Sequence, residues 1–198
     1  MNTDMSAILE QLEKRDRAIV LTGISWSQLE TLDAAFSNMA GVKLFYLDGI
    51  LEIMTVSPDH EDIKRTIGLL VEAYMREKGI RFYGRGAPTL GGEAQNARKE
   101  PDESYNIGNK KENPDLVIEV IFTSGGLDKL QFYKRIGVFE VWFWEDGVLS
   151  LYCLDGEYQK VNRSKLLPDL DIAMLARYIV YFDQYDAVTE FLNNLRET

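Results

Sequence analysis

Two residue types with cross-linking and catalytic chemistry are nearly missing from this chain of 198 residues. The single cysteine, Cys153, excludes an intrachain disulfide, and its apolar surroundings predict a small core side chain. The single histidine, His60, excludes a metal site built on two histidines. His60 shares a helical spacing with Ile63 and Ile67, which favours a hydrogen-bonded histidine at the edge of the core over a catalytic base.

Long hydrophobic runs are also missing. A run such as residues 116–122 is broken by Glu119 and is far shorter than the roughly 20 residues that a membrane-spanning helix needs. The chain begins MNTDMS, which lacks a basic segment followed by an apolar one, so no export signal is predicted. These observations predict a cytoplasmic protein without a membrane segment.

Basic residues are in the minority. The chain has 22 lysines and arginines against 32 acidic residues, a formal net charge of −10. This balance argues against a general nucleic-acid binder, since phosphate binding usually requires a basic surface. It does not exclude a nuclease, whose site needs carboxylates to hold metal. A surface for DNA would then be local, induced by metal or built by oligomerisation. We predict a homodimer that meets through the apolar strand at residues 139–144 and the hairpin after it.

Apolar periodicity and turn signals predict one mixed α/β domain over residues 1–198. Residues 1–40 are expected to form a helical extension, about 41–165 the core, and 166–198 the closing helices. Residues 84–99 are expected to be mainly loop, with a short strand near 89–90. Helices are predicted at 24–36, 57–79, 127–136, 170–180 and 182–195. Strands are predicted at 43–46, 50–55, 80–83, 102–107, 115–122, 139–144, 148–154 and 157–161.

The strand at residues 115–122 carries the most information. Its nearly continuous apolar character indicates a central strand that is buried on both faces. The break at residues 123–126, the following helix and the strand at 139–144 form a strand–helix–strand unit. The two strands should therefore be parallel, with a right-handed crossover.

Glu119 lies in the middle of that strand, where burying an unpaired carboxylate would cost several kcal/mol. It therefore needs a metal ion, a lysine or an arginine beside it; the alternative is an edge strand with Glu119 facing water. Asp102 starts the preceding strand, so the two carboxylates can meet. Lys129 shares a helical stripe with Tyr133 and Ile136 in the next helix, and its position in the first turn directs its ammonium group toward the end of the Glu119 strand.

Two carboxylates and one lysine form a coherent set for cleaving phosphodiesters. The carboxylates would hold Mg²⁺ or Mn²⁺ together with water and a phosphate oxygen. The lysine would orient the water or neutralise developing negative charge. On spacing alone this pattern is weak, because Pro-Asp followed by a distant glutamate is common.

Several segments in the same order resemble the Uma-type family of restriction endonuclease-like proteins, within the PD-(D/E)xK nuclease superfamily. The supporting segments are YLDGILEIM (46–54), SPDHE (57–61), PDE (101–103), NPDLVIEV (113–120), DKLQFY (128–133) and GVFEVW (137–142). The resemblance implies a restriction-endonuclease-like mixed sheet flanked by helices, with Asp102 and Glu119 as metal ligands. It departs from the motif at Ile121, where the lysine is expected, and implies that Lys129 supplies that group from the following helix.

The sequence leaves several roles open. Accessory ligands or hydrogen-bonding groups could come from His60, Glu52, Glu61, Glu103 and Asp115, although each acidic residue is more often a solvated charge. Phosphate contacts could come from Arg85, Arg98 and Lys99, for which a solvated surface is an equal alternative. We predict a metal-dependent endonuclease acting on DNA. The alternatives are a non-catalytic, DNA-associated interaction protein that keeps the fold, which the motif's missing lysine favours, and a phosphodiesterase for RNA or nucleotides.

Overall fold

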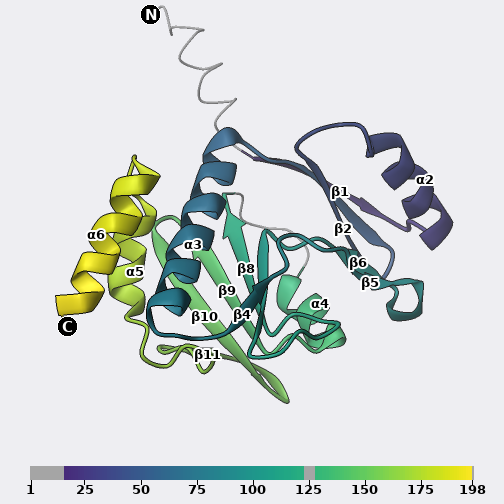
Figure 1. Cartoon of the computed structure of the whole chain (residues 1–198). Helices are drawn as coiled ribbons and strands as arrows, with labels where there is room; N and C mark the ends of the chain where they lie inside the picture. Colours follow the sequence, from purple (N-terminus) through teal and green to yellow (C-terminus); the bar gives the residue numbers. More distant parts are fainter. Residues whose placement is uncertain (1–15, 123–127, 198) are drawn as a thin grey trace, which may run out of the picture.

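The strands of the computed structural model, which describes residues 16–122 and 128–197, form two sheets. Figure 1 shows them with their helices. The first sheet has the order β1 (Arg17–Thr22), β3 (Ile50–Thr55), β2 (Val42–Leu47), β6 (Ala97–Lys99) and β5 (Leu90–Gly92). The second has the order β11 (Glu157–Val161), β10 (Val148–Asp155), β9 (Glu140–Glu145), β8 (Leu116–Ile121), β7 (Glu103–Ile107) and β4 (Phe82–Gly84). The predicted mixed fold of sheets flanked by helices is confirmed.

The helices cover three sheet faces. They are α2 (Trp26–Phe36), α3 (Pro58–Glu77), α4 (Lys129–Ile136), α5 (Ile172–Ile179) and α6 (Gln184–Glu197), with a short 3-10 turn at Glu93–Gln95. Helices α3, α5 and α6 lie on one face of the six-stranded sheet, and α2 lies at the far end of the molecule, beside the five-stranded sheet (Figure 1). Within the described ranges, no helix is both long and apolar enough to cross a membrane.

Alternation along β8 separates two cores. Leu116, Ile118 and Val120 belong to the cluster formed with α3, α5 and α6. Val117 belongs to the opposite cluster, which contains α4 and residues such as Phe45 of the five-stranded sheet. Glu119 shares the Val117 face, because the two are two residues apart in a strand. The carboxylate is therefore directed into the layer between the two sheets, where α4 packs.

The strand–helix–strand prediction is confirmed, since β8 and β9 pair in parallel. β8 lies between β9 and β7, so it is a central strand and not an edge. The predicted break at residues 123–126 and the helix start at residue 127 lie outside the described residues. Asp128 caps α4 by accepting a hydrogen bond from the amide of Gln131.

Two parts of the chain differ from the sequence prediction. Residues 17–22 form β1 within the segment expected to be a helical extension, and α2 accounts for its described helical part. Residues 84–99 contain β5, the 3-10 turn and β6, where mainly loop was predicted. β5 lies close to the short strand predicted near residues 89–90, whereas β6, with three residues, is too short to show a period-two pattern and was missed.

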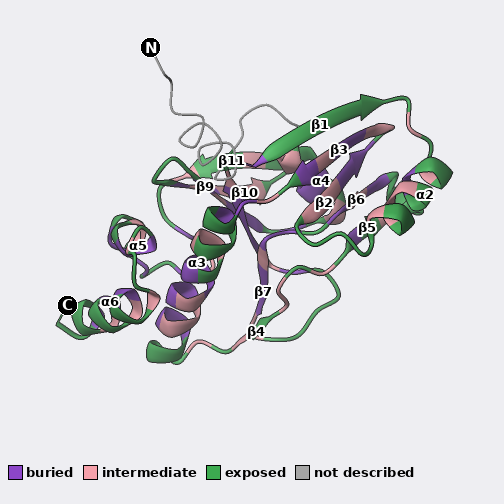
Figure 2. Cartoon of the chain, turned by 90° about the horizontal axis from the view of Figure 1, so that it is seen from above, coloured by how far each residue is buried: buried purple, intermediate pink, exposed green. Residues whose placement is uncertain are grey.

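The predicted dimer surface is partly buried and partly exposed. β9 lies between β8 and β10, and its Val141, Trp142 and Trp144 side chains are buried, but Phe139 before it is 39% accessible and Val148 of the following hairpin is 59% accessible. Exposed apolar residues also lie on β1, an edge strand of the five-stranded sheet. Figure 2 shows β1 exposed along its length, and Ile19 is 63% accessible.

The close approach of β5 to β6 depends on Gly91. Its backbone has φ +80°, and an added Cβ would lie 2.2 Å from the carbonyl oxygen of Ala97. We expect Gly91→Ala to lower the free energy of unfolding by about 3 kcal/mol, because left-handed strain adds to a backbone clash. Urea denaturation measures this. Gly108→Ala is the matched control, with φ +79° and open space around it. It should lose about 1 kcal/mol, and equal losses in the two variants would contradict the clash.

Candidate active site

Strand register brings the two predicted carboxylates together. β7 and β8 are antiparallel, with Glu103 opposite Ile118, so Asp102 falls opposite Glu119. Side chains at directly opposed positions lie roughly 5 Å apart at their Cβ atoms. Asp102 is 3% exposed and Glu119 is 1% exposed. The pair is therefore shielded from water, and the alternative of a solvent-facing Glu119 is wrong.

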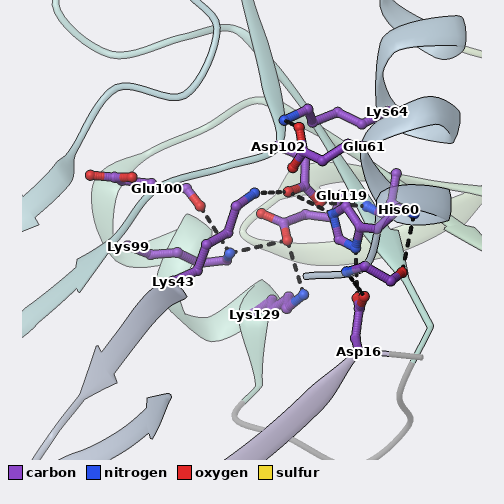
Figure 3. Close-up of polar contacts among 12 residues, drawn as sticks. Asp16, Lys43, His60, Glu61, Lys64, Lys99, Glu100, Asp102, Glu119 and Lys129 are labelled. Carbon is purple, nitrogen blue, oxygen red and sulfur yellow. Dashed lines mark hydrogen bonds and ion pairs between the residues drawn. The ribbon is translucent and has the colours of Figure 1, made fainter. Parts of the chain in front are cut away.

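Glu119 is bound by three groups. Lys129 Nζ lies 2.9 Å from its Oε2 atom, and Lys99 Nζ lies 3.1 Å from the same atom. The hydroxyl of Tyr133 donates to Oε1. Lys129 and Tyr133 are one turn apart on α4, so the predicted stripe does point its polar groups at β8. Lys99 comes from β6, in the other sheet (Figure 3).

Asp102 is held from the other side. Its Oδ1 atom forms an ion pair with Lys43 of β2, and its Oδ2 atom accepts from the amide of Val120 at 2.8 Å. His60 Nε2 lies 3.1 Å from Oδ1 without the direction of a hydrogen bond, so this contact is electrostatic. Together the four oxygens of Asp102 and Glu119 each face a cation or a hydrogen-bond donor.

His60 connects the site to the beginning of the described chain. Its side chain is buried, and its Nδ1 atom lies 2.6 Å from Asp16 Oδ2. Asp16 also accepts from the amide of Ser57, the residue that caps α3. Burial lowers the pKa of His60, but Asp102 and Asp16 outweigh it and raise the pKa to about 9. His60 is therefore a buried, protonated histidine at neutral pH, which agrees with a hydrogen-bonded histidine at the edge of the core.

Charges set the protonation of the central groups. Burial opposes ionisation of both carboxyls, yet His60 and Lys43 hold the pKa of Asp102 well below its usual value. Lys129 and Lys99 likewise lower the pKa of Glu119. Burial by itself would lower the pKa values of Lys43 and Lys129, but the carboxylates raise them. For Lys99 burial prevails, and its pKa is lowered.

The accessory acidic residues divide by position. Glu52 is buried, lines a small cavity with Lys43, Lys99 and Lys129, and helps to raise the pKa of Lys129. Glu61 pairs with Lys64 on α3, close to Asp102 in Figure 3. Glu103 lies against Gly68 and Tyr105, where burial raises its pKa.

Three other predicted residues lie away from the carboxylate pair. Asp115, which precedes β8, accepts from the amide of Ile107 and pairs with Lys111. Arg85 donates to Asn106 and to the carbonyl of Lys111. Arg98 pairs with Asp33 of α2. Of the three predicted phosphate contacts, only Lys99 joins the site.

Sequence reasoning missed Lys43, Asp16 and the hydrogen bond of Tyr133 to Glu119. Lys43 lies in an apolar strand and pairs with Asp102, 59 positions away in the sequence. The sequence signal for Lys43 is only that a charged residue stands among apolar neighbours. Asp16 lies in a segment without periodicity, and nothing in its surroundings marks it.

The donor set fits a hard divalent cation. Mg²⁺ is usually bound by one or two carboxylates, with water and phosphate oxygens completing its shell. Asp102 and Glu119 supply two such carboxylates on adjacent strands. In the described part of the chain, no three histidine, cysteine or acidic side chains are grouped to hold a metal. Any metal here would therefore rely on this pair and on water or substrate.

The chain matches a family model over residues 26–177, and it belongs to that family, Uma2, which is described as "Putative restriction endonuclease". No curated protein matches the chain. The matched region contains Lys43, His60, Asp102, Glu119 and Lys129, whereas Asp16 precedes it. The family is one of nucleases, which agrees with the restriction-endonuclease-like interpretation of the sequence.

Proposed function

We propose that this protein is an endonuclease that hydrolyses phosphodiester bonds of DNA with Mg²⁺ or Mn²⁺. One observation carries the proposal: the buried pair Asp102 and Glu119 lies in register on adjacent strands, with Lys129 Nζ 2.9 Å from Glu119. Membership of the Uma2 family supports the class of reaction. A net charge of −10 makes DNA binding depend on the metal and on the lysines of this site.

Asp102 and Glu119 would hold the cation. When bound, the cation would lower the pKa of a coordinated water and stabilise charge at the phosphate. Lys129 is fixed by Glu119 and by the start of α4, so its ammonium group is preorganised for the negative charge that develops during cleavage. The backbone amide of Val120 donates a hydrogen bond to Asp102 Oδ2 and so fixes the orientation of this carboxylate. The β7–β8 register keeps the two carboxylates at a fixed separation.

The direct test is cleavage of single- and double-stranded DNA and RNA in the presence of Mg²⁺ or Mn²⁺. We expect DNA to be cut in a metal-dependent way. Cleavage of RNA alone would change the substrate class but keep the site. No cleavage of any of the four substrates would contradict the proposal.

A second candidate is a non-catalytic, DNA-associated protein. It is favoured by the observation that protein cations or donors already face all four carboxylate oxygens. Divalent-metal binding separates the two candidates, because a protein without nuclease chemistry has no need of it.

We expect Mg²⁺ or Mn²⁺ at millimolar concentration to raise the melting temperature, since a ligand that binds the native state stabilises it. A metal present at 100 times its dissociation constant would contribute about 2.7 kcal/mol. Differential scanning calorimetry measures the shift. Asp115→Asn, a carboxylate variant at the other end of β8, should keep it, whereas Glu119→Gln should not. A wild-type protein with no shift and no heat of metal binding would show that the carboxylates do not hold a cation.

We also propose a homodimer, because pairing two acidic subunits would bring two metal-binding sites to one duplex. The apolar residues exposed on β1 offer a contact surface. Light scattering at micromolar concentration should give twice the chain mass. A mass near 22.7 kDa would reject the dimer.

A further inference from the structure

The buried cluster around Asp102 and Glu119 is formally neutral. Three lysines face three carboxylates: Lys43, Lys99 and Lys129 against Glu52, Asp102 and Glu119, with the His60–Asp16 pair beside them. Adding a divalent cation would leave two uncompensated positive charges in a buried site, which is costly. The cation can therefore enter favourably only if an anion enters with it or if a lysine leaves its carboxylate.

Lys43 is the lysine paired with Asp102, and its side chain is 16% exposed, against 15% for Lys129 and 5% for Lys99. Lys129 pairs with Glu119 from the start of α4, so Lys43 is the lysine whose departure frees Asp102. Lys99 is further fixed by a hydrogen bond to the carbonyl of Glu100 and by its place over the ring of Phe45. If Lys43 leaves Asp102, that carboxylate keeps the Val120 amide and His60.

There is space beside Lys43 for a phosphate group. Lys43 and Lys99 line a hollow of about 170 Å³ between α2 and the five-stranded sheet. That is several times the roughly 30 Å³ that a water molecule occupies in the liquid. Arg98, which pairs with Asp33, and Glu100 also line the hollow, so an anion bound there would depend on Lys43 and Lys99. Figure 3 shows Lys43 directed from the opposing sheet toward Asp102.

We propose that Lys43 is an exchangeable cation that holds Asp102 in the substrate-free protein and turns to a non-bridging phosphate oxygen when a divalent cation takes Asp102. The inference rests on the proposed function and adds a residue and a coupling to it. The phosphodiester anion offsets one of the two positive charges that the cation adds, and Lys43 keeps its own charge paired throughout. Metal and phosphodiester must then bind with positive coupling, each raising the affinity for the other.

The test titrates Mn²⁺ by calorimetry, with and without dimethyl phosphate as a minimal diester. In the wild type, we expect the diester to raise the Mn²⁺ affinity on the order of 10-fold. In Lys43→Met, Mn²⁺ alone should bind several-fold more tightly than in the wild type, because its competitor for Asp102 is gone. The effect of the diester should be largely lost. A variant that binds Mn²⁺ no more tightly, or that keeps the full coupling, would overturn the proposal.

Two further proteins make the test decisive. Lys43→Gln removes the charge but can still donate to Asp102, and it should show the same changes if Lys43→Met does not fold. If neither variant folds, Lys43 is a fixed structural partner and the proposal is wrong. Lys111→Met removes the lysine of a more exposed lysine–aspartate pair, with Asp115, and should bind Mn²⁺ as the wild type does.

The outcomes also separate this proposal from the nuclease assignment. Wild-type protein that binds no Mn²⁺ would overturn both. Wild-type protein that binds Mn²⁺ and cuts DNA, with Lys43→Met unchanged in metal binding and coupling, would overturn only the exchange of Lys43.

Discussion

Glu119→Gln is expected to lose metal-dependent cleavage by roughly 10³-fold, at the upper end of the cost of removing one preorganised electrostatic group. The substitution keeps the size of the side chain and its hydrogen bond with Tyr133. It removes the negative charge that a divalent cation would need. Steady-state cleavage of DNA in Mg²⁺ measures the loss.

Glu119→Gln should also destabilise the protein, and this loss of stability must be distinguished from the loss of cleavage. Lys129 and Lys99 would remain buried without their counter-charge, and breaking a buried ion pair costs about 3–5 kcal/mol. The lowered pKa of Lys99 reduces this cost, because that lysine can lose its proton more easily.

A double variant separates the two effects. Glu119→Gln combined with Lys99→Met removes the more deeply buried of the two uncompensated cations, so it should recover part of the unfolding free energy while cleavage stays lost. Recovery of cleavage together with stability would mean that Glu119 serves the fold and not the reaction.

Lys129→Met is expected to lower the cleavage rate by roughly 10²-fold, the usual cost of losing one charge donor. Folding should survive, because Glu119 keeps Lys99 and Tyr133 as partners. Metal affinity should be nearly unchanged. Single-turnover cleavage and Mn²⁺ calorimetry, measured on the same preparation, distinguish a loss of rate from a loss of metal.

Lys134→Met is the matched control. Lys134 lies on the same helix but pairs with Glu157 at the surface, so its replacement should leave the rate unchanged. If Lys129→Met cleaves as fast as the wild type, Lys129 takes no part in the reaction. Lys99 would then be the candidate for its role, since Arg98 is paired with Asp33.

Local sequence was sufficient to predict the central element of the site. An apolar strand interrupted by Glu119 indicated a buried carboxylate, and the stripe shared by Lys129 and Tyr133 indicated which face of the next helix meets it. The strand order around β8 confirms the first inference. The contacts of Lys129 and Tyr133 with Glu119 agree with the second.

The other half of the site depends on pairing between sheets, which local patterns do not encode. Lys43 and Lys99 reach the carboxylates because β2 and β6 are neighbours in the five-stranded sheet, with Phe45 opposite Lys99. β6 has only three residues, so no periodicity revealed it. Asp16 contacts His60 across 44 positions, and such a contact follows from the tertiary arrangement alone.

The wide separation of these residues along the chain also affects how the protein is made. The ion pairs of the cluster join Asp16 to His60 and Lys43 to Asp102, and the last of its members in the sequence is Lys129. Contacts between such distant positions form late in folding, because the entropy cost of closing a long loop must be met before the contacts contribute any stabilisation. A chain still being synthesised therefore assembles the cluster only after α4 has emerged. A ribosome-bound fragment ending at β8 would hold both carboxylates without the lysine of α4, so an enzyme that works as proposed would lack that group until most of the chain has been translated.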